Sequence, residues 1–161
     1  LPELLAKYGS IRGKPKIQML EGMEGVRQAY QEAYALLNEG KNEGLWFGNI
    51  SFILEHFPQM IKEYDAILAK LKTYRIRDIT VGGEKGEEWV KRMQQHPNPQ
   101  YQIRYLNDNN QCGMTDQLIV GSKLILFSMS PTELFTLIIE SEELAKTQRF
   151  LFNCLWNMPT K

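Results

Sequence analysis

Histidine and cysteine, on which metal centres and many active sites depend, are scarce in this sequence. It contains two histidines, His56 and His96, and two cysteines, Cys112 and Cys154. Neither histidine has a second His, a Cys or a pair of carboxylates at ligand spacing, so the sequence predicts no metal site and no cofactor. The two cysteines are far apart in the sequence and indicate neither a disulfide nor a metal site.

The sequence also lacks an excess of charge of either sign. Lys and Arg total 19 and Asp and Glu total 19, which gives a formal net charge of 0. A balanced chain has no overall field to attract nucleic acid or an anionic membrane. No apolar stretch reaches the roughly 18 residues that a membrane span needs, and the N-terminus lacks the charged and apolar regions of a signal peptide. We therefore expect a cytoplasmic protein with no membrane partner.

The strongest signal that the sequence does contain is near its C-terminus. Residues 134–139 form a nearly unbroken apolar run, which predicts an inner strand covered on both faces. Ser141 follows in the position of a helix N-cap, and two glutamates occupy the first turn. The next residues recur at helical spacing and predict one broad, buried face: Leu144, Ala145, Gln148, Leu151, Phe152 and Leu155.

Strands and helices alternate through the rest of the chain. At 161 residues and 43% hydrophobic composition, the chain is long enough for one core and too short for two. Predicted strands are residues 16–20, 45–47, 75–81, 101–106, 117–120 and 123–128, and predicted helices are residues 24–37, 58–71 and 84–95. Gly121 and Ser122 form a two-residue hairpin connection. This order predicts a single-domain α/β fold, with a mixed β-sheet and helices on both faces.

Residues 1–15 are expected to stand apart from the domain formed by residues 16–161. Residues 1–8 (LPELLAKY) indicate the end of an amphipathic helix, and residues 10–16 (SIRGKPK) have the composition of a linker. A helix of eight residues would be marginal alone. We therefore expect the natural protein to extend before Leu1.

Polar residues that follow the predicted strands are the best candidates for a ligand site. They are Glu21, Asn49, Ser51, Asn107 and Asp108. Open α/β sheets usually bind ligands at the carboxyl ends of their strands, so these side chains predict a small-molecule site there. The same residue types also form turns, which is the alternative explanation of their positions. No serine lies in a nucleophile-elbow pattern, and no catalytic residue is assigned.

Three stretches resemble the TrmB-type transcriptional regulators. Residues 137–156 (LIIESEELAKTQRFLFNCLW) are similar to the end of that family's effector domain, which has a strand, an Ile-Glu-Ser-Glu-Glu turn and a helix finishing on Trp. LPELLAKY followed by KPKIQMLEGMEGVRQAY resembles the family's junction between winged helix and effector domain. RIRDITV, residues 75–81, is in the place of a family strand. The resemblance covers most of the chain and is weakest over residues 84–114.

The resemblance implies a phospholipase-D-like fold used for regulation. Phospholipase-D enzymes carry a His-x-Lys, then four residues, then Asp, and placing that motif here puts Thr115, Gln117 and Ser122 at the three positions. Neither the nucleophile nor the acid remains, so a phosphodiesterase mechanism is not expected. The best-known family members bind sugars with a further C-terminal domain. This chain stops soon after Trp156, so sugar recognition is not carried over residue by residue.

Together these observations predict a non-enzymatic effector-sensing or dimerisation domain of a TrmB-like regulator. It would act as a homodimer and bind a small-molecule effector, with a sugar among the candidates. DNA would be bound only through a winged helix expected before Leu1, to which residues 1–8 would transmit the change. One alternative is a freestanding hydrolase that uses Glu21, Asp108 or Asp116 with a metal. Another is a pure interaction module in which the N-terminal helix pairs two copies.

Overall fold

The computed structural model describes residues 14–40, 42–107, 113, 115–130 and 132–159. Its strands are β1 (Lys16–Glu21), β2 (Glu43–Asn49), β3 (Arg75–Val81), β4 (Tyr101–Tyr105), β5 (Thr115–Val120), β6 (Lys123–Ser130) and β7 (Glu133–Glu140). Its helices are α2 (Gly22–Asn38), α3 (Ile50–His56), α4 (Pro58–Leu68), α5 (Gly83–Met93) and α6 (Glu142–Trp156). The predicted helix over residues 1–8 and most of the predicted linker lie outside the described residues.

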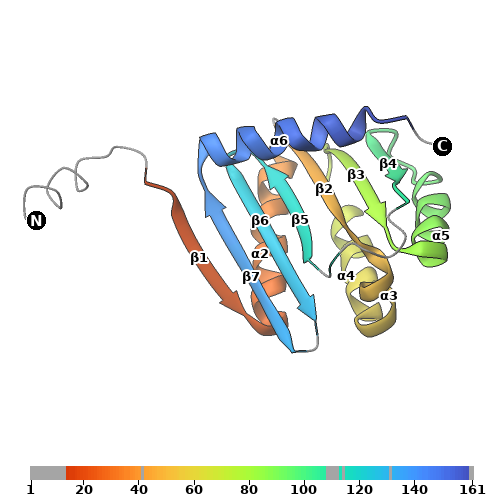
Figure 1. Ribbon diagram of the computed structural model, residues 1–161, viewed down its shortest axis with the longest axis horizontal. Helices are drawn as coiled ribbons and strands as arrows, with labels where there is room; N and C mark the ends of the chain where they lie inside the picture. Colours follow the sequence, from red (N-terminus) through yellow and green to blue (C-terminus); the bar gives the residue numbers. More distant parts are fainter. Residues whose placement is uncertain (1–13, 41, 108–112, 114, 131, 160–161) are drawn as a thin grey trace, which may run out of the picture.

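The strands form one seven-stranded mixed sheet in the order β1-β7-β6-β5-β2-β3-β4 (Figure 1). Strands β2, β3 and β4 are mutually parallel, while each neighbouring pair from β1 across to β2 is antiparallel. The predicted hairpin joins β5 to β6, and Gly121 has a φ of 56°, in the left-handed region that favours glycine. The predicted mixed sheet is therefore confirmed.

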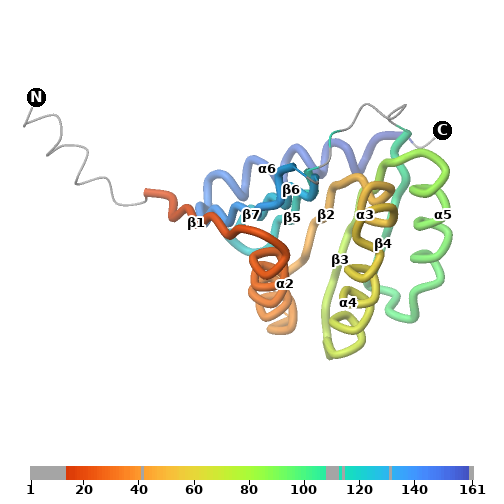
Figure 2. The backbone as a smooth tube through the Cα atoms, turned by 90° about the horizontal axis from the view of Figure 1, so that it is seen from below, coloured from red at the N-terminus to blue at the C-terminus, as the bar shows by residue number. Residues whose placement is uncertain are grey.

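The helices are divided unequally between the two faces of the sheet. Figure 2 shows α2 on one side of the sheet and α6 on the other. Residues of α2, α3, α4 and α5 share one hydrophobic cluster with the sheet, whereas α6 packs in a second cluster on the opposite face. Helices on both faces were predicted and are confirmed, and among the described helices only α6 lies on its side of the sheet.

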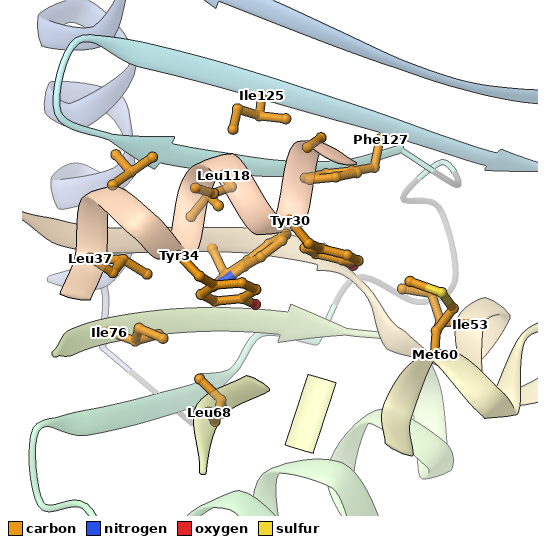
Figure 3. Packing of buried hydrophobic residues seen from close by; sticks show 14 of the residues in the cluster. Tyr30, Tyr34, Leu37, Ile53, Met60, Leu68, Ile76, Leu118, Ile125 and Phe127 are labelled. Carbon is orange, nitrogen blue, oxygen red and sulfur yellow. The ribbon is translucent and has the colours of Figure 1, made fainter. Parts of the chain in front are cut away.

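The larger cluster is built around stacked aromatic rings between α2 and the middle of the sheet. The ring of Tyr30 lies 4.8 Å from that of Phe127, and the ring of Trp46 lies 5.5 Å from Phe127, centroid to centroid. Figure 3 shows Tyr30 and Tyr34 projecting from α2 toward the strands, with Ile53 and Met60 side by side at the far end. Phe127 is fully buried, so this stack is the centre of the core.

Arg77 on β3 contacts α6 on the face of the sheet opposite the larger cluster. Its guanidinium donates hydrogen bonds of 2.8 and 2.9 Å to the two carboxylate oxygens of Glu43, and a third of 3.0 Å to Asn153 Oδ1 on α6. The same group lies 5.4 Å from the ring centroids of both Phe152 and Trp156. A planar guanidinium can make all of these contacts at once, which a lysine could not.

Of two predictions about the C-terminal helix, one is confirmed and one is wrong. Ser141 does cap α6, since its Oγ accepts a hydrogen bond from Leu144 N at 3.3 Å. The prediction of one broad buried face is wrong, because Leu144 and Leu151 are 40% and 48% exposed while Ala145 and Phe152 are buried. The reason is geometric: α6 crosses the strands near one end of the sheet, so only a narrow stripe of the helix meets it (Figure 1).

Strand β7 is correspondingly less covered than predicted. It is an inner strand, as expected, since it pairs with both β1 and β6. Thr136 and Ile138 are buried on the α2 side, but Phe135 and Leu137 on the α6 face are only half-buried. Helix α6 contacts β6, β5 and β2 more than β7, so the apolar run is covered fully on one face alone.

The second strand and the segment after it also differ from the prediction. Strand β2 runs from Glu43 to Asn49 and not only over residues 45–47, because Gly48 and Asn49 continue the pairing with β3. Residues 52–56, for which no strand or helix is predicted, belong to a short helix, α3. The Asn49 side chain caps it by accepting a hydrogen bond from Ser51 N at 3.2 Å. Asn49 is thus both the end of β2 and the N-cap of α3.

Candidate functional site

A cavity of about 50 Å³ lies between the sheet and the helices of the larger cluster. Its walls come from seven elements, and the lining residues are Tyr30, Trp46, Gly48, Ile50, Ile53, Met60, Ile61, Tyr64, Asp78, Thr80, Trp89 and Asp116. Gly48, Ile50 and Ile61 are only half-buried, so the cavity opens near the carboxyl end of β2. Asp78 and Asp116 are the two ionisable acids in this otherwise aromatic and aliphatic lining.

Asp78 reaches the cavity because it occupies an inward position of β3. Side chains alternate along a strand, so Ile76, Asp78 and Thr80 face the larger cluster while Arg77 faces α6. Asp78 is 9% exposed. Its Oδ2 accepts a hydrogen bond of 2.9 Å from the Tyr101 hydroxyl, which lies 3.0 Å from the Tyr64 hydroxyl. One carboxylate oxygen of Asp78 is thereby engaged by a short chain of phenols.

Asp116 enters the cavity from β5, on the other side of β2. It is 8% exposed, and its Oδ1 accepts a hydrogen bond of 3.0 Å from the backbone N–H of Asn49. Glycine is required beside it, because a side chain at Gly48 would overlap Oδ1 and Cγ of Asp116 and lie 3.0 Å from its Cβ. Gly48 therefore lets a carboxylate from the neighbouring strand lie directly over the β2 backbone.

Burial changes the acidity of both carboxyl groups. Loss of hydration raises the pKa of Asp78 to about 7, and the charge of Asp116 adds to the rise while the Tyr101 hydrogen bond opposes it. Loss of hydration likewise raises the pKa of Asp116 to about 7, against the Asn49 hydrogen bond. Each group therefore changes its charge near neutral pH.

The described part of the chain contains no group of three or more His, Cys, Asp or Glu side chains that could hold a metal ion. Within the same residues, neither Asp78 nor Asp116 forms an ion pair with a Lys, Arg or His side chain. Two acids buried without a cationic partner are unusual, because a buried charge is normally paired. The arrangement can accept a proton or a cation at each carboxyl group.

The structure brings together two of the residues predicted to line a ligand site. Asn49 and Ser51 are the sequence neighbours of Gly48 and Ile50, which line the cavity, although neither of the two lines it. Ser51 Oγ donates a hydrogen bond to the Gly82 carbonyl. Gly82 has a φ of 120°, and a side chain there would clash with Ser51 and would lie 2.6 Å from Asn49 Oδ1. Asn49 also donates its backbone N–H to Asp116, so it links the predicted site to the cavity.

The other predicted residues are not gathered with these two. Glu21 ends β1, four strands from β2, which corresponds to ~19 Å at about 4.8 Å per strand. Asn107 follows β4, two strands from β2, and is exposed. Asp108 lies outside the described residues. Glu21, Asn49 and Asn107 thus lie at strand ends on one side of the sheet, but only Asn49 and Ser51 are next to residues that line the cavity.

The positions equivalent to the phospholipase-D motif lie away from the cavity. Thr115 pairs with Ser128, and Gln117 pairs with both Phe47 and Leu126, on the α6 face of the sheet. Ser122 follows Gly121 in the hairpin between β5 and β6. No acid or base is the cross-strand partner of Thr115 or Gln117.

Two solved structures share this fold. One is TrmBL2, an archaeal chromatin protein, with a TM-score of 0.50 and 13% identity over 96% of this chain and 57% of that chain. The other is NucT from Helicobacter pylori, with a TM-score of 0.53 and 10% identity over 87% of this chain and 94% of that chain. The protein has a phospholipase-D-like α/β fold. At these identities the matches show the fold alone.

The two comparisons based on sequence give no match. No protein-family model matches the sequence, and no curated protein matches it. The chain spans 57% of TrmBL2, so a large part of that protein has no counterpart in the match. No described helix is long and apolar enough to cross a membrane.

Sequence reasoning missed the two buried acids of the cavity. Asp78 was included only within a predicted strand, and Asp116 was considered only as a metal-binding acid of an alternative hydrolase. One signal was available for Asp78: it shares the inward phase of its strand with Ile76 and Thr80, where an acid is not expected. Trp46 and Trp89 are buried in the core.

Proposed function

We propose that this chain is a non-catalytic sensing domain of a TrmB-like regulatory protein, and that its effector is a small molecule bound between Asp78 and Asp116. The cavity is the observation that carries the proposal, because it joins convergent polar groups to an apolar wall in one small space. The fold match to TrmBL2, whose reported structure shows a mode of DNA binding, supports a DNA-related role. The resemblance of residues 1–30 and 137–156 to TrmB regulators agrees with it.

The proposed mechanism is a shift between two conformations. Binding in the cavity would fix α2, α3, α4 and α5 relative to the sheet, since all four helices contribute a wall. Helix α2 follows β1 directly, at Gly22, whose φ is 67°. A movement of α2 therefore displaces β1 and the chain that precedes it, which we propose leads to a DNA-binding part outside residues 1–161.

The sensing role predicts a ligand-dependent change in DNA affinity. The full-length protein should be titrated onto its operator DNA, followed by fluorescence anisotropy, with and without a panel of cationic, neutral and anionic metabolites. An active effector is expected to change the affinity by about fivefold or more, the usual range of allosteric coupling. The Asp116→Asn variant should lose the response, whereas Asp65→Asn on the α4 surface should keep it. Absence of DNA binding, or a response that both variants retain, would exclude this function.

We also propose that the domain is a homodimer joined through β1. This strand lies at the edge of the sheet and pairs, within the described residues, only with β7. Ile17 and Met19 are 65% and 56% exposed, and their cross-strand partners Ile139 and Leu137 continue the same apolar surface. An edge strand with exposed apolar side chains is a ready surface for pairing with a second copy.

A charge placed on this surface is expected to separate the copies. The double substitution Ile17→Lys and Met19→Lys puts like charges opposite one another and should weaken self-association by about a hundredfold or more. Gln18→Lys is the matched control, since Gln18 is exposed on the other face of the same strand. Sedimentation velocity over a range of concentrations measures the association. An unmodified protein that stays monomeric, or a double variant that stays dimeric, would contradict the dimer.

A further inference from the structure

The buried carboxyl groups of the cavity lack a positive partner in the protein. Asp78 uses Oδ2 to accept from Tyr101, and Asp116 uses Oδ1 to accept from Asn49, both of them neutral donors. Neither acid is in an ion pair within the described residues, although seven ion pairs occur elsewhere among them. Buried carboxylates require a cation or a proton for neutrality, so a partner from outside the chain would satisfy them.

The walls around the acids show which cations would fit. Tyr30, Trp46, Tyr64 and Trp89 contribute aromatic rings to the lining. Aromatic rings attract organic cations through their electron-rich faces, and the Arg92 guanidinium already lies over Trp89, 4.7 Å from the ring centroid. A metal ion is less well accommodated, because Mg²⁺ usually keeps several water ligands, for which a cavity of about 50 Å³ leaves little room, and no group of three His, Cys, Asp or Glu side chains among the described residues could hold a metal ion. Besides the two carboxyl groups, the side-chain oxygens in the lining are the Thr80 hydroxyl and the phenols of Tyr30 and Tyr64. Aromatic walls with two acids therefore favour an ammonium or guanidinium group over a metal ion.

The size of the cavity limits the cation further. A cavity of about 50 Å³ holds roughly three to five groups of the size of a water molecule, since each needs about 10 to 15 Å³. A primary ammonium with one or two carbon atoms fits this space, and so does a guanidinium group. Larger molecules would place only their cationic head here and leave through the opening beside Gly48 and Ile50.

We propose that the cavity binds the ammonium or guanidinium head of a small organic cation, held between the carboxylates of Asp78 and Asp116. This inference rests on the proposed sensing function and specifies the chemical class of the effector. Charge pairing supplies the attraction, and the rings exclude water from it.

Such a site would bind more weakly as the pH falls. The titratable groups that interact with the two carboxyl groups are Tyr30 and Tyr34 from α2, Tyr64 from α4 and Tyr101 from β4. Burial raises the pKa of each phenol, so all four stay neutral. The carboxyl groups alone therefore set the charge of the site near neutral pH. At pH 6 a carboxyl with a pKa of about 7 is roughly one-tenth ionised, so affinity should fall about tenfold or more between pH 8 and pH 6.

Titration with ethylammonium chloride, followed by NMR of the tryptophan indole N–H signals, tests the inference. Trp46 and Trp89 line the cavity, whereas Trp156 packs on the opposite face of the sheet and serves as an internal control. We expect the first two signals to shift at pH 8 with a dissociation constant of about 1 mM, near the limit for three non-hydrogen atoms. Ethanol, sodium chloride and magnesium chloride should leave them in place.

Variants show whether the acids carry the binding. Asp78→Asn and Asp116→Asn are each expected to weaken ethylammonium binding at least tenfold at pH 8, and Asn keeps the oxygen that accepts the existing hydrogen bond. Trp89→Phe keeps both acids and should weaken binding several-fold. Asp65→Asn, on the α4 surface where Asp65 pairs with Arg92, should bind as the unmodified protein does.

The outcomes separate this inference from the sensing function. Absence of shifts at pH 8, equal shifts with ethanol, or shifts with Mg²⁺ alone would contradict the proposed binding of an organic cation. If a neutral metabolite then changed the DNA affinity, and Asp116→Asn abolished that change, the sensing function would be supported without a cation site. Ethylammonium binding that depends on both acids upholds the cation site. Should no cation then alter DNA affinity in the full-length protein, the sensing function would fail while the site remained.

Discussion

Replacement of Asp78 or Asp116 by asparagine is expected to make the protein more stable at pH 8 and to leave its stability nearly unchanged at pH 4. The folded pKa of each acid is about 7, whereas the ordinary value is 3.8. Between these values the unfolded chain releases protons that the folded chain retains. The free energy of unfolding therefore falls as the pH rises from about 4 to about 7, and the loss is complete above pH 7.

The size of this effect follows from the shift. About three pKa units at about 1.4 kcal/mol per unit give an upper limit of about 4 kcal/mol for each acid. We expect each single replacement to raise the free energy of unfolding by about 2 to 4 kcal/mol at pH 8. The double variant should gain less than the sum, because the charge of Asp116 contributes to the shift of Asp78.

Urea denaturation at a series of pH values measures the change. Asp65→Asn is the matched control, because it removes a half-exposed carboxylate of the same size and should change the free energy of unfolding by no more than about 1 kcal/mol. A gain that does not depend on pH, or a loss at pH 8, would show that the two carboxyl groups are not buried as the structure has them. A real gain would mean that the natural acids reduce stability, as functional groups often do.

Alanine at position 48 is expected to damage both the fold and the cavity. The added methyl group would overlap the Asp116 carboxylate, which must move and give up its hydrogen bond from Asn49. Overpacking of this kind typically costs about 1 to 3 kcal/mol. Loss of the hydrogen bond would add about 1 kcal/mol. Binding of ethylammonium should be lost at the same time, because one of the two carboxylates no longer faces the cavity.

Gly44→Ala on the same strand provides the comparison. An added Cβ there lies 3.3 Å from the end of the buried Leu37 side chain, a much smaller overlap than the one at Gly48, and meets no carboxylate. Its effect on the free energy of unfolding should be less than about 1 kcal/mol. Denaturation of the two variants in parallel distinguishes a specific clash from a general intolerance of alanine in β2. Equal stability of the two proteins would be inconsistent with the position of Asp116.

The parts of the fold that sequence predicted well are those encoded by neighbouring residues. The apolar run of β7, the cap at Ser141 and the Gly121 turn are each specified within a few positions, and each is found where it was expected. Exposure was predicted less well. Leu144 and Leu151 keep helical spacing, but whether they are covered depends on the angle at which α6 crosses the sheet, and no local pattern records that angle.

The cavity could not be assembled from the sequence for a related reason. Its acids lie 38 positions apart in the sequence, on strands separated by β2, and their neighbours there are ordinary strand residues. Only the sheet order brings Asp116 next to Gly48 and Asn49. Asn49 and Ser51 could be proposed because the carboxyl end of a strand is a general location for ligands. No comparable rule predicts from the sequence that α2, α4 and α5 contribute walls to the cavity.

Strand β3 places two consecutive side chains in different environments. Asp78 faces the cavity, whereas Arg77 reaches through the other surface of the sheet to Glu43, Asn153 and the rings of α6. Because Arg77 and Asp78 are consecutive residues of one strand, a displacement of the β3 backbone at Asp78 would also move the Arg77 guanidinium. Binding in the cavity would then affect the C-terminal helix α6 directly across the sheet, without the participation of a loop.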